Sequence, residues 1–229
     1  PDIESKYEGN GDGRGWNAGI HYQLTDKIGL GLSYRSKVDL DLRGDFELKF
    51  PDNIVQIPKI PADLEISLPS QILGGVSFQY KRLLFEIGGK WEEWSRFDTL
   101  KLKTGQPVFG GEIPPVQKNW EDTWGINLGL KLNITERTAL SMGYIHEWSP
   151  IPDETFDPQV PAGDKNIYSI GFQKSDFIKQ NLIFAVAYMY ETYNSRNKRN
   201  DVGAELGGTA NGNYDQYSHL VSASITIFF

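Results

Sequence analysis

Apolar and non-apolar residues alternate one by one in nine separate segments of this chain. In residues 124–132 every second residue is Trp, Ile or Leu, and the residues between them are Gly, Asn or Lys. Successive side chains of a strand point to opposite faces of a sheet, so this alternation predicts strands rather than helices. The nine predicted strands lie within residues 16–24, 28–36, 72–80, 84–91, 124–132, 140–144, 167–172, 182–190 and 221–229.

The connections between these segments alternate between short and long. Short turns are expected at residues 25–27, 81–82, 133–137 and 174–179. The long connections, which we expect to be loops, are residues 37–69, 95–121, 149–165 and 192–214. Short turns at one end and long loops at the other are typical of outer-membrane barrels, with the turns in the periplasm and the loops outside the cell.

The two faces of the predicted strands separate a membrane barrel from a water-soluble one. Glycine, Asn, His and Gln occupy the non-apolar face, which suits a barrel interior better than a solvated surface. Aromatic residues at strand ends are expected to form girdles at the membrane interfaces: Trp16, Tyr34, Tyr80, Trp91, Trp124 and Tyr190. We therefore predict an all-β fold, an antiparallel transmembrane β-barrel of the outer membrane. A soluble β-sandwich or lipocalin-like barrel is the alternative.

The final predicted strand ends on an aromatic residue, Phe229. Terminal residues of soluble domains usually fray into water, so such an ending favours a lipid environment. In outer-membrane proteins the terminal strand closes the barrel and the assembly machinery recognises its aromatic end. We expect Phe229 to have this role.

The composition restricts the possible partners. The chain has 229 residues and a formal net charge of −7, which argues against binding to nucleic acid. It contains no cysteine, so we expect neither disulfides nor a cysteine-ligated metal. No run of about 18 apolar residues is present, so no transmembrane helix is predicted. The chain begins at Pro1, and we expect it to be a mature or truncated product.

Four segments resemble one protein family. They are GDGRGWNAGIHYQLTDKIGLGLSYRSKV (residues 11–38), WEEWSRFDTL (91–100), NWEDTWGINLGL (119–130) and SPIPDETFDPQVP (149–161). Together they resemble the FadL/TodX family of outer-membrane transporters for long-chain fatty acids and other hydrophobic compounds. The resemblance extends in order over essentially the whole chain.

The resemblance implies a barrel of fourteen strands with an N-terminal hatch domain in its lumen. Nine strands are predicted here, so residues 1–229 are expected to be the C-terminal portion of one barrel domain, without the hatch and about five strands. A terminal barrel strand runs towards the periplasm, and counting back gives the first strand the same direction. Residues 2–14 are therefore expected outside the cell. We expect a monomeric barrel in contact with outer-membrane lipid.

The implied function is passive uptake of long-chain fatty acids or related hydrophobic compounds across a Gram-negative outer membrane. No cofactor is expected, and no enzyme activity. The three histidines, His21, His146 and His219, are scattered and lack metal-ligand spacing, so neither a metal site nor a catalytic site is expected. The alternatives are an aromatic hydrocarbon transporter of the same fold, an adhesin or phage receptor that acts through its outer loops, and an outer-membrane lipid hydrolase.

Cations on the inward face are candidates for binding a carboxylate, because a cation inside a largely apolar passage attracts an anion. The candidates are Arg35, Lys90, Lys131 and, at the outer mouth, Lys118. The alternative is that these cations pair with acidic residues of the same face. Glu147 lies two residues before the SPIP motif, and we expect it to have a gating or structural role.

Apolar residues supply the other candidates. Residues 182–190 are apolar on both faces, so the inward residues Ile183, Ala185, Ala187 and Met189 are expected to line a passage for hydrophobic molecules. Apolar outer-loop residues are expected to capture ligand first, with packing of the loops on one another as the alternative. These are Ile54, Ile57, Ile60, Val108 and Phe109. The basic run 196–199 is expected to be a solvated loop tip, within reach of lipopolysaccharide phosphates.

Overall fold

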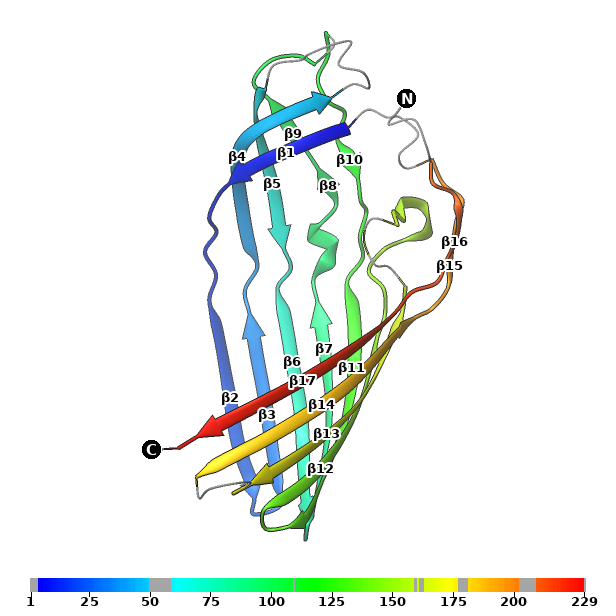
Figure 1. Ribbon diagram of the computed structural model, residues 1–229. Coiled ribbons are helices and arrows are strands. Elements are labelled where there is room, and N and C mark those ends of the chain that lie inside the picture. The colour runs from blue at the N-terminus through cyan, green and yellow to red at the C-terminus, as the bar shows by residue number, and fades with distance from the viewer. Residues whose placement is uncertain are drawn as a thin grey trace.

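The computed structural model describes residues 4–49, 59–108, 110–158, 160, 163–176, 181–201 and 209–228. Its main feature is an antiparallel nine-stranded sheet with the order β17-β14-β13-β12-β11-β7-β6-β3-β2 (Figure 1). The strands are β2 (Asn17–Thr25), β3 (Ile28–Arg35), β6 (Gln71–Tyr80), β7 (Leu83–Glu92), β11 (Thr123–Thr135), β12 (Thr138–Glu147), β13 (Lys165–Ser175), β14 (Leu182–Tyr193) and β17 (Tyr217–Ile227). The prediction of these nine strands is confirmed.

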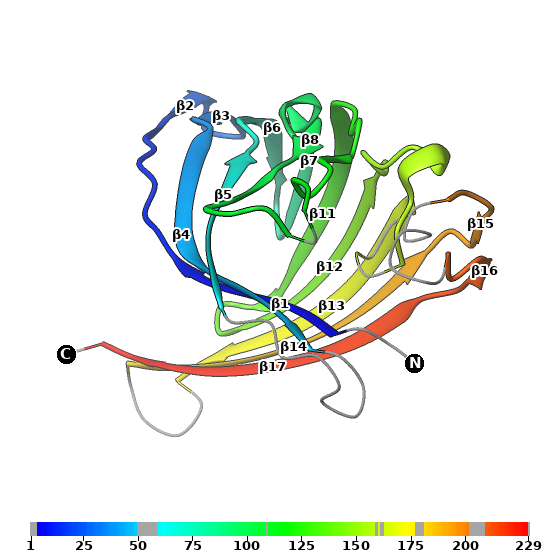
Figure 2. The same ribbon diagram turned by 90° about the horizontal axis from the view of Figure 1, so that it is seen from above.

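The strands pair in the order in which they occur along the chain, and the sheet curves (Figure 2). β2 and β17 are its two edge strands, and within the described residues neither has a partner on its free side. The sheet is therefore not closed. Unpaired backbone groups are very unfavourable in hydrocarbon, so both edges need partners in a membrane.

One face of the main sheet is apolar and aromatic. The strand register aligns Tyr144, Tyr168, Tyr190 and His219 side by side across β12, β13, β14 and β17. The ring centroids of Tyr144 and Tyr168 lie 5.2 Å apart, and those of Tyr190 and His219 lie 5.0 Å apart. On the same face Trp124 is 61% exposed. A broad exposed apolar face of this kind is expected of a surface in lipid, and we call it the outer face.

The opposite, inner face consists largely of glycine and polar residues. The register places Gly31, Gly75 and Gly88 in one row across β3, β6 and β7. His21 on β2 and Asn127 on β11 continue the row at its two ends. Since the glycines carry no side chain, they leave open space in front of the sheet.

Three of the four long connections, residues 37–69, 95–121 and 192–214, contain strands, so the expectation that these three are loops is wrong. A second antiparallel sheet has the order β1-β4-β5-β9, formed by β1 (Glu4–Asn10), β4 (Val38–Lys49), β5 (Ile60–Leu68) and β9 (Leu102–Thr104). Smaller pairs join β8 (Thr99–Leu100) to β10 (Val116–Gln117), and β15 (Arg196–Lys198) to β16 (Gly212–Tyr214). Two short 3₁₀ helices, η2 (Trp94–Arg96) and η3 (Asp153–Thr155), complete the outer elements.

These outer elements stand at the end of the main sheet opposite its short turns (Figure 1). β1 belongs to them, and the extracellular position expected for residues 2–14 stays a prediction. In the second sheet Phe46 lies opposite Ile60, and both side chains are buried, Ile60 with only 2% exposed. Its core is therefore the apolar face of β4 and β5.

Within the described residues, no helix is both long enough and apolar enough to span a membrane.

Candidate functional site

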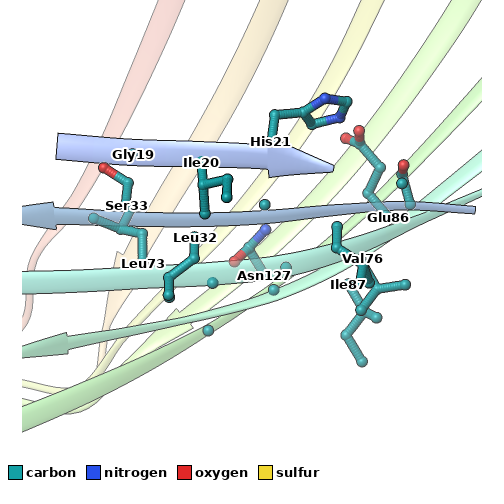
Figure 3. A pocket seen from close by; sticks show the side chains of 18 residues that line it. Gly19, Ile20, His21, Leu32, Ser33, Leu73, Val76, Glu86, Ile87 and Asn127 are labelled. Carbon is teal, nitrogen blue, oxygen red and sulfur yellow. The ribbon is translucent and has the colours of Figure 1, made fainter. Parts of the chain in front are cut away.

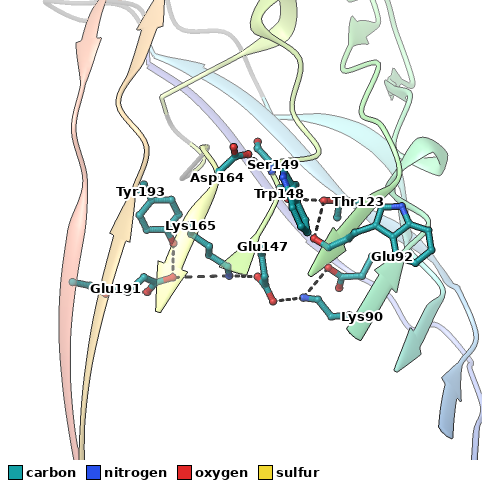
Figure 4. A network of polar contacts seen from close by, with 12 residues as sticks. Lys90, Glu92, Thr123, Glu147, Trp148, Ser149, Asp164, Lys165, Glu191 and Tyr193 are labelled. Carbon is teal, nitrogen blue, oxygen red and sulfur yellow. Dashed lines mark hydrogen bonds and ion pairs between the residues drawn. The ribbon is translucent and has the colours of Figure 1, made fainter. Parts of the chain in front are cut away.

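A chain of ion pairs crosses the inner face near the outer end of the main sheet (Figure 4). The Nζ atom of Lys90 lies 2.9 Å from a carboxylate oxygen of Glu92 and 2.5 Å from one of Glu147. The Nζ atom of Lys165 lies 2.6 Å from the other oxygen of Glu147 and 3.9 Å from Glu191. Each side chain is less than a third exposed, so the pairs are more than surface contacts.

The register explains why these charges meet. Lys90 on β7 and Glu147 on β12 both lie opposite Gly125, which belongs to the strand between them. Lys165 on β13 lies directly opposite Glu147. The long side chains of Lys90 and Glu147 therefore meet above a residue that has no side chain.

Neutral side chains hydrogen-bond to the glutamates at both ends of this chain of ion pairs. The amide of Gln71 donates a hydrogen bond to Glu92. Glu191 accepts hydrogen bonds from the hydroxyls of Tyr193, at 2.8 Å, and Ser218, at 2.9 Å. The three glutamates and two lysines carry a combined charge of −1, and both lysines are already paired with carboxylates.

A cavity of about 310 Å³ lies against these ion pairs. We call it the amphipathic pocket, because charged residues and aromatic or aliphatic residues both line it. Its polar residues include Lys90, Glu92, Glu147, Lys165 and Tyr193. Its apolar and aromatic residues include Trp94, Trp120, Pro150, Ile151 and Val160.

The aromatic side of this pocket is a packed cluster. The ring of Trp120 lies 5.0 Å from that of Trp94 and 4.7 Å from that of Phe97, measured between centroids. Trp94 and Phe97 belong to the WSRF motif, and Trp120 belongs to the NWED motif. Two of the four segments that carried the family resemblance therefore meet at this pocket.

The SPIPDETFDPQVP segment contributes another part of the pocket wall. We call residues 149–156 the roof segment, of which Ser149, Pro150 and Ile151 line the pocket. The backbone N–H of Ser149 donates to a carboxylate oxygen of Asp164 at 2.9 Å. Ile151 is 6% exposed and Phe156 2%, so the segment is packed against the protein.

A second cavity, of about 590 Å³, lies over the row of inner-face glycines. We call it the glycine groove. His21 and Glu86 point to one side of the sheet here, whereas Ile87 points to the other (Figure 3). A Cβ atom at Gly31 would meet nothing within 4 Å. The groove is therefore an open recess beside the polar side chains of the inner face.

The predicted cations have different environments. Lys90 pairs with two carboxylates of the inner face. For this residue the structure therefore agrees with the alternative prediction, in which the cation pairs with acidic residues rather than with a ligand. Arg35, Lys118 and Lys131 have no ion pair within the described residues. Arg35 lies opposite Gln71, and Lys131 lies opposite Leu84 and Ser141. For these three cations, ligand binding stays a prediction.

The predicted apolar wall is one strand wide. Ile183, Ala185, Ala187 and Met189 share one face of β14. Their neighbours on that face are mostly small or polar: Ser175, Gln173, Gly171 and Ser169 on β13, and Thr226, Ser224, Ser222 and Leu220 on β17. The wall is thus an apolar stripe between two strands whose residues on this face are mostly small or polar.

Few of the predicted loop residues lie in the described part of the chain. Ile60 is buried in the second sheet, which agrees with the alternative that outer-loop residues pack on one another. Val108 forms an isolated bridge with Gly111. Ile54, Ile57 and Phe109 lie outside the described residues, and so does Phe229.

The prediction that the run 196–199 is a solvated loop tip is wrong for two of its residues. Lys198 is only 1% exposed and donates to the carbonyl of Thr209. The side chain of Arg196 is 11% exposed and donates to the carbonyl of Ile151 at 2.7 Å. Both cations satisfy backbone carbonyls of neighbouring segments, and such contacts cannot be seen in a linear sequence.

Sequence reasoning also missed Lys165, Trp94, Trp120 and Tyr193. For Lys165 a signal was present, because extending the alternation of residues 167–172 by two residues puts it on the inner face. The aromatic residues lie outside the alternating segments or at their ends. Within the described residues, no group of His, Asp and Glu side chains could hold a metal ion.

Comparison with known proteins identifies the family. The model of the outer membrane protein transport protein family (OMPP1/FadL/TodX) matches residues 2–229. The chain belongs to this family. It is therefore part of an outer-membrane β-barrel, and relatives named in the comparison are transport proteins rather than enzymes.

The most similar proteins include one curated relative and two solved structures. The long-chain fatty acid transport protein of Escherichia coli O6:H1 is 26% identical over 187 residues, which is 75% of this chain and 41% of that protein. A Pseudomonas aeruginosa FadL homologue superimposes with a TM-score of 0.79 at 22% identity, over 93% of this chain and 52% of that one. The Pseudomonas putida toluene transporter TodX gives 0.67 at 16% identity, over 99% and 53%. The chain thus spans about half the length of these proteins.

Proposed function

We propose that this chain forms part of a passive channel for hydrophobic compounds, and that the amphipathic pocket is a binding site on the path. The family membership supports this proposal. So does the pocket itself, which is lined by aromatic and aliphatic side chains together with charged ones. A pocket that is mostly apolar with a few polar groups is typical of sites for small hydrophobic ligands.

The charges of the pocket favour a ligand without a negative charge. Lys90 and Lys165 each contact a carboxylate within 3 Å, and the five charged groups sum to −1. A fatty-acid carboxylate placed here would add a second uncompensated negative charge, and like charges disfavour each other's ionised form. A hydroxyl group or a hydrocarbon would meet no such repulsion. The ion pairs of Lys90 are the observation that carries this proposal.

The second candidate is uptake of long-chain fatty acids through another cation. Arg35, Lys118 and Lys131 have no ion pair within the described residues, so any of them is available to a carboxylate. A relative of this chain is named a long-chain fatty acid transport protein, and a solved structure of the same fold is named a toluene transporter. Both ligand classes therefore need a direct comparison.

Two brominated ligands of equal chain length make this comparison. Bromine quenches tryptophan fluorescence at short range, and Trp94 and Trp120 line the pocket. In the gene product that carries this chain, reconstituted in lipid vesicles, 9,10-dibromooctadecanol should quench these tryptophans. Trp94→Phe combined with Trp120→Phe should reduce this quenching, and adding Trp148→Phe should remove the contribution of the third tryptophan that lines the pocket. 9,10-Dibromooctadecanoate should bind at the pocket about tenfold more weakly or worse, as expected for an uncompensated charge.

The opposite result would favour the second candidate. If the acid binds more tightly than the alcohol, and Lys131→Met, Arg35→Met or Lys118→Met weakens only the acid, the channel serves fatty acids through that cation. Equal binding of both ligands would remove the electrostatic argument. Contact with lipopolysaccharide, recognition of Phe229 by the assembly machinery, outer-loop capture and a monomeric state remain predictions.

A further inference from the structure

Arg196 makes several different contacts with the roof segment. Its Nη1 atom donates to the carbonyl oxygen of Ile151 at 2.7 Å and lies 3.4 Å from the hydroxyl oxygen of Ser149. Its Nη2 atom forms an ion pair with Asp153. The guanidinium carbon lies 4.7 Å from the ring centroid of Phe156. One planar side chain thus binds the roof segment by charge, by hydrogen bonds and by stacking.

The roof segment is also held from its other side. The backbone N–H of Glu121 donates to the carbonyl of Pro150 at 2.8 Å, and the hydroxyl of Thr155 donates to the carbonyl of Lys118. These partners belong to the connection before β11, whereas Arg196 belongs to β15, beyond the end of β14. The segment therefore has two anchors that come from distant parts of the chain.

Three residues of the roof segment line the amphipathic pocket. Ser149, Pro150 and Ile151 form part of its wall, and these are residues at which Arg196 or its opposite anchor binds. We propose that Arg196 is a positioning residue, which holds the roof segment over the pocket and thereby sets how fast a ligand enters and leaves. This proposal rests on the proposed function of the pocket.

A cover changes rates in a way that a ligand contact does not. Loosening a cover lowers the barrier in both directions, so association and dissociation accelerate together and the dissociation constant changes little. Loss of a ligand contact accelerates mainly dissociation and weakens affinity. Arg196 can therefore be classified by measuring both rates.

The test combines thiol labelling with ligand kinetics in the vesicle-reconstituted gene product. This chain contains no cysteine, so Ile151→Cys supplies a single thiol in the roof segment. Arg196→Gln should accelerate maleimide labelling of this thiol about tenfold, as expected for losing a charged hydrogen bond. It should also accelerate the onset and the reversal of quenching by 9,10-dibromooctadecanol by similar factors. Arg199→Gln is the matched control, because Arg199 is exposed and its side chain donates a hydrogen bond to Asn197 of its own hairpin rather than to the roof segment.

Each result decides the proposal. Unchanged labelling would overturn it, and so would faster dissociation with unchanged association. If Arg196→Gln does not assemble, Arg196→Lys replaces it, since lysine keeps the charge but not the planar fork, and should give an intermediate acceleration of both rates. Absence of quenching in the unaltered protein would contradict the proposed function instead, and the labelling comparison would still test whether Arg196 holds the roof segment.

Discussion

Lys90 and Glu147 belong to strands that are not neighbours, yet their charged atoms lie 2.5 Å apart above Gly125. A Cβ atom at residue 125 would lie 3.0 Å from Cγ of Glu147 and 3.6 Å from Cε of Lys90. The ion pair across β11 therefore depends on a glycine between its partners. This relationship can be tested without altering either charge.

Gly125→Val should disrupt the ion-pair chain and lower the free energy of unfolding by about 1–3 kcal/mol, the usual cost of overpacking. Urea unfolding in lipid vesicles measures this change. The matched control is Gly129→Val on the same face of the same strand, where the nearest contacts of a Cβ atom, to Glu86, are ordinary at 3.4 and 3.5 Å. Equal losses for both variants would mean that the space above Gly125 has no special role.

Lys90→Met should destabilise the protein more than the double change of Lys90→Met with Glu92→Gln. The single change leaves two partly buried carboxylates without one of their cations, at a cost of about 1–3 kcal/mol. The double change removes one charge of each sign. The comparison again uses urea unfolding in vesicles. If Lys90→Met leaves stability unchanged and weakens only fatty-acid binding, Lys90 is the ligand-binding cation that the sequence predicted.

Val186→Arg and Ala187→Arg should have opposite effects. Val186 lies beside Ala223 and Phe172 on the outer face, whereas Ala187 lies beside Gly171 and Ser222 on the inner face. Arginine on a lipid-facing site costs about 2–4 kcal/mol near the bilayer midplane, while lumen sites tolerate it. Val186→Arg should therefore reduce assembly, and Ala187→Arg should assemble but reduce uptake per molecule. The measurements are urea unfolding and uptake of labelled ligand at matched surface protein.

The result for Ala187→Arg has two informative alternatives. Destabilisation of this variant alone would mean that the assignment of the inner and outer faces is reversed. Normal assembly with full uptake would place the apolar stripe of β14 away from the path of the ligand.

Gly31→Trp should obstruct the glycine groove without affecting assembly, because a side chain there enters open space. If ligand passes along this groove, uptake should fall severalfold while the amount of assembled protein stays the same. Gly111→Trp is the control. Gly111 lies in an outer connection, and a Cβ atom there also meets nothing within 4 Å. Unchanged uptake by Gly31→Trp would exclude the groove from the path.

The loop that carries Trp94 should loosen in acid. Hydrogen bonds from Arg96 and Ser70 lower the pKa of Glu93 below its ordinary value of 4.5. The folded protein therefore binds this proton less readily than the unfolded chain, and the stabilisation is present above pH 4.5. It is lost as the pH falls through the lowered pKa. Tryptophan fluorescence should report this loosening, and Glu93→Gln should remove that part of the pH dependence. An identical acid transition in the variant would exclude Glu93 as its cause.

The sequence by itself determined the nine strands of the main sheet and the face that each side chain takes. Both follow from the period-two geometry of an extended backbone, which is a local property. Residues 38–43 alternate just as clearly, Val, Leu and Leu against Asp, Asp and Arg, and β4 could have been predicted from the same rule. The length of a connection is therefore a weaker guide to its structure than its alternation.

The tertiary structure decided which residues meet. Lys90, Glu147 and Lys165 are far apart in the chain, and their contacts require the register of four strands. Register is set by pairing between distant segments, and a shift of one residue moves every side chain to the other face. The contacts of Arg196 with the roof segment, and the meeting of Trp94 with Trp120, depend likewise on how outer segments fold back. Alternation within a strand can assign a cation to the lumen, but only the pairing of strands determines whether a carboxylate already lies beside it.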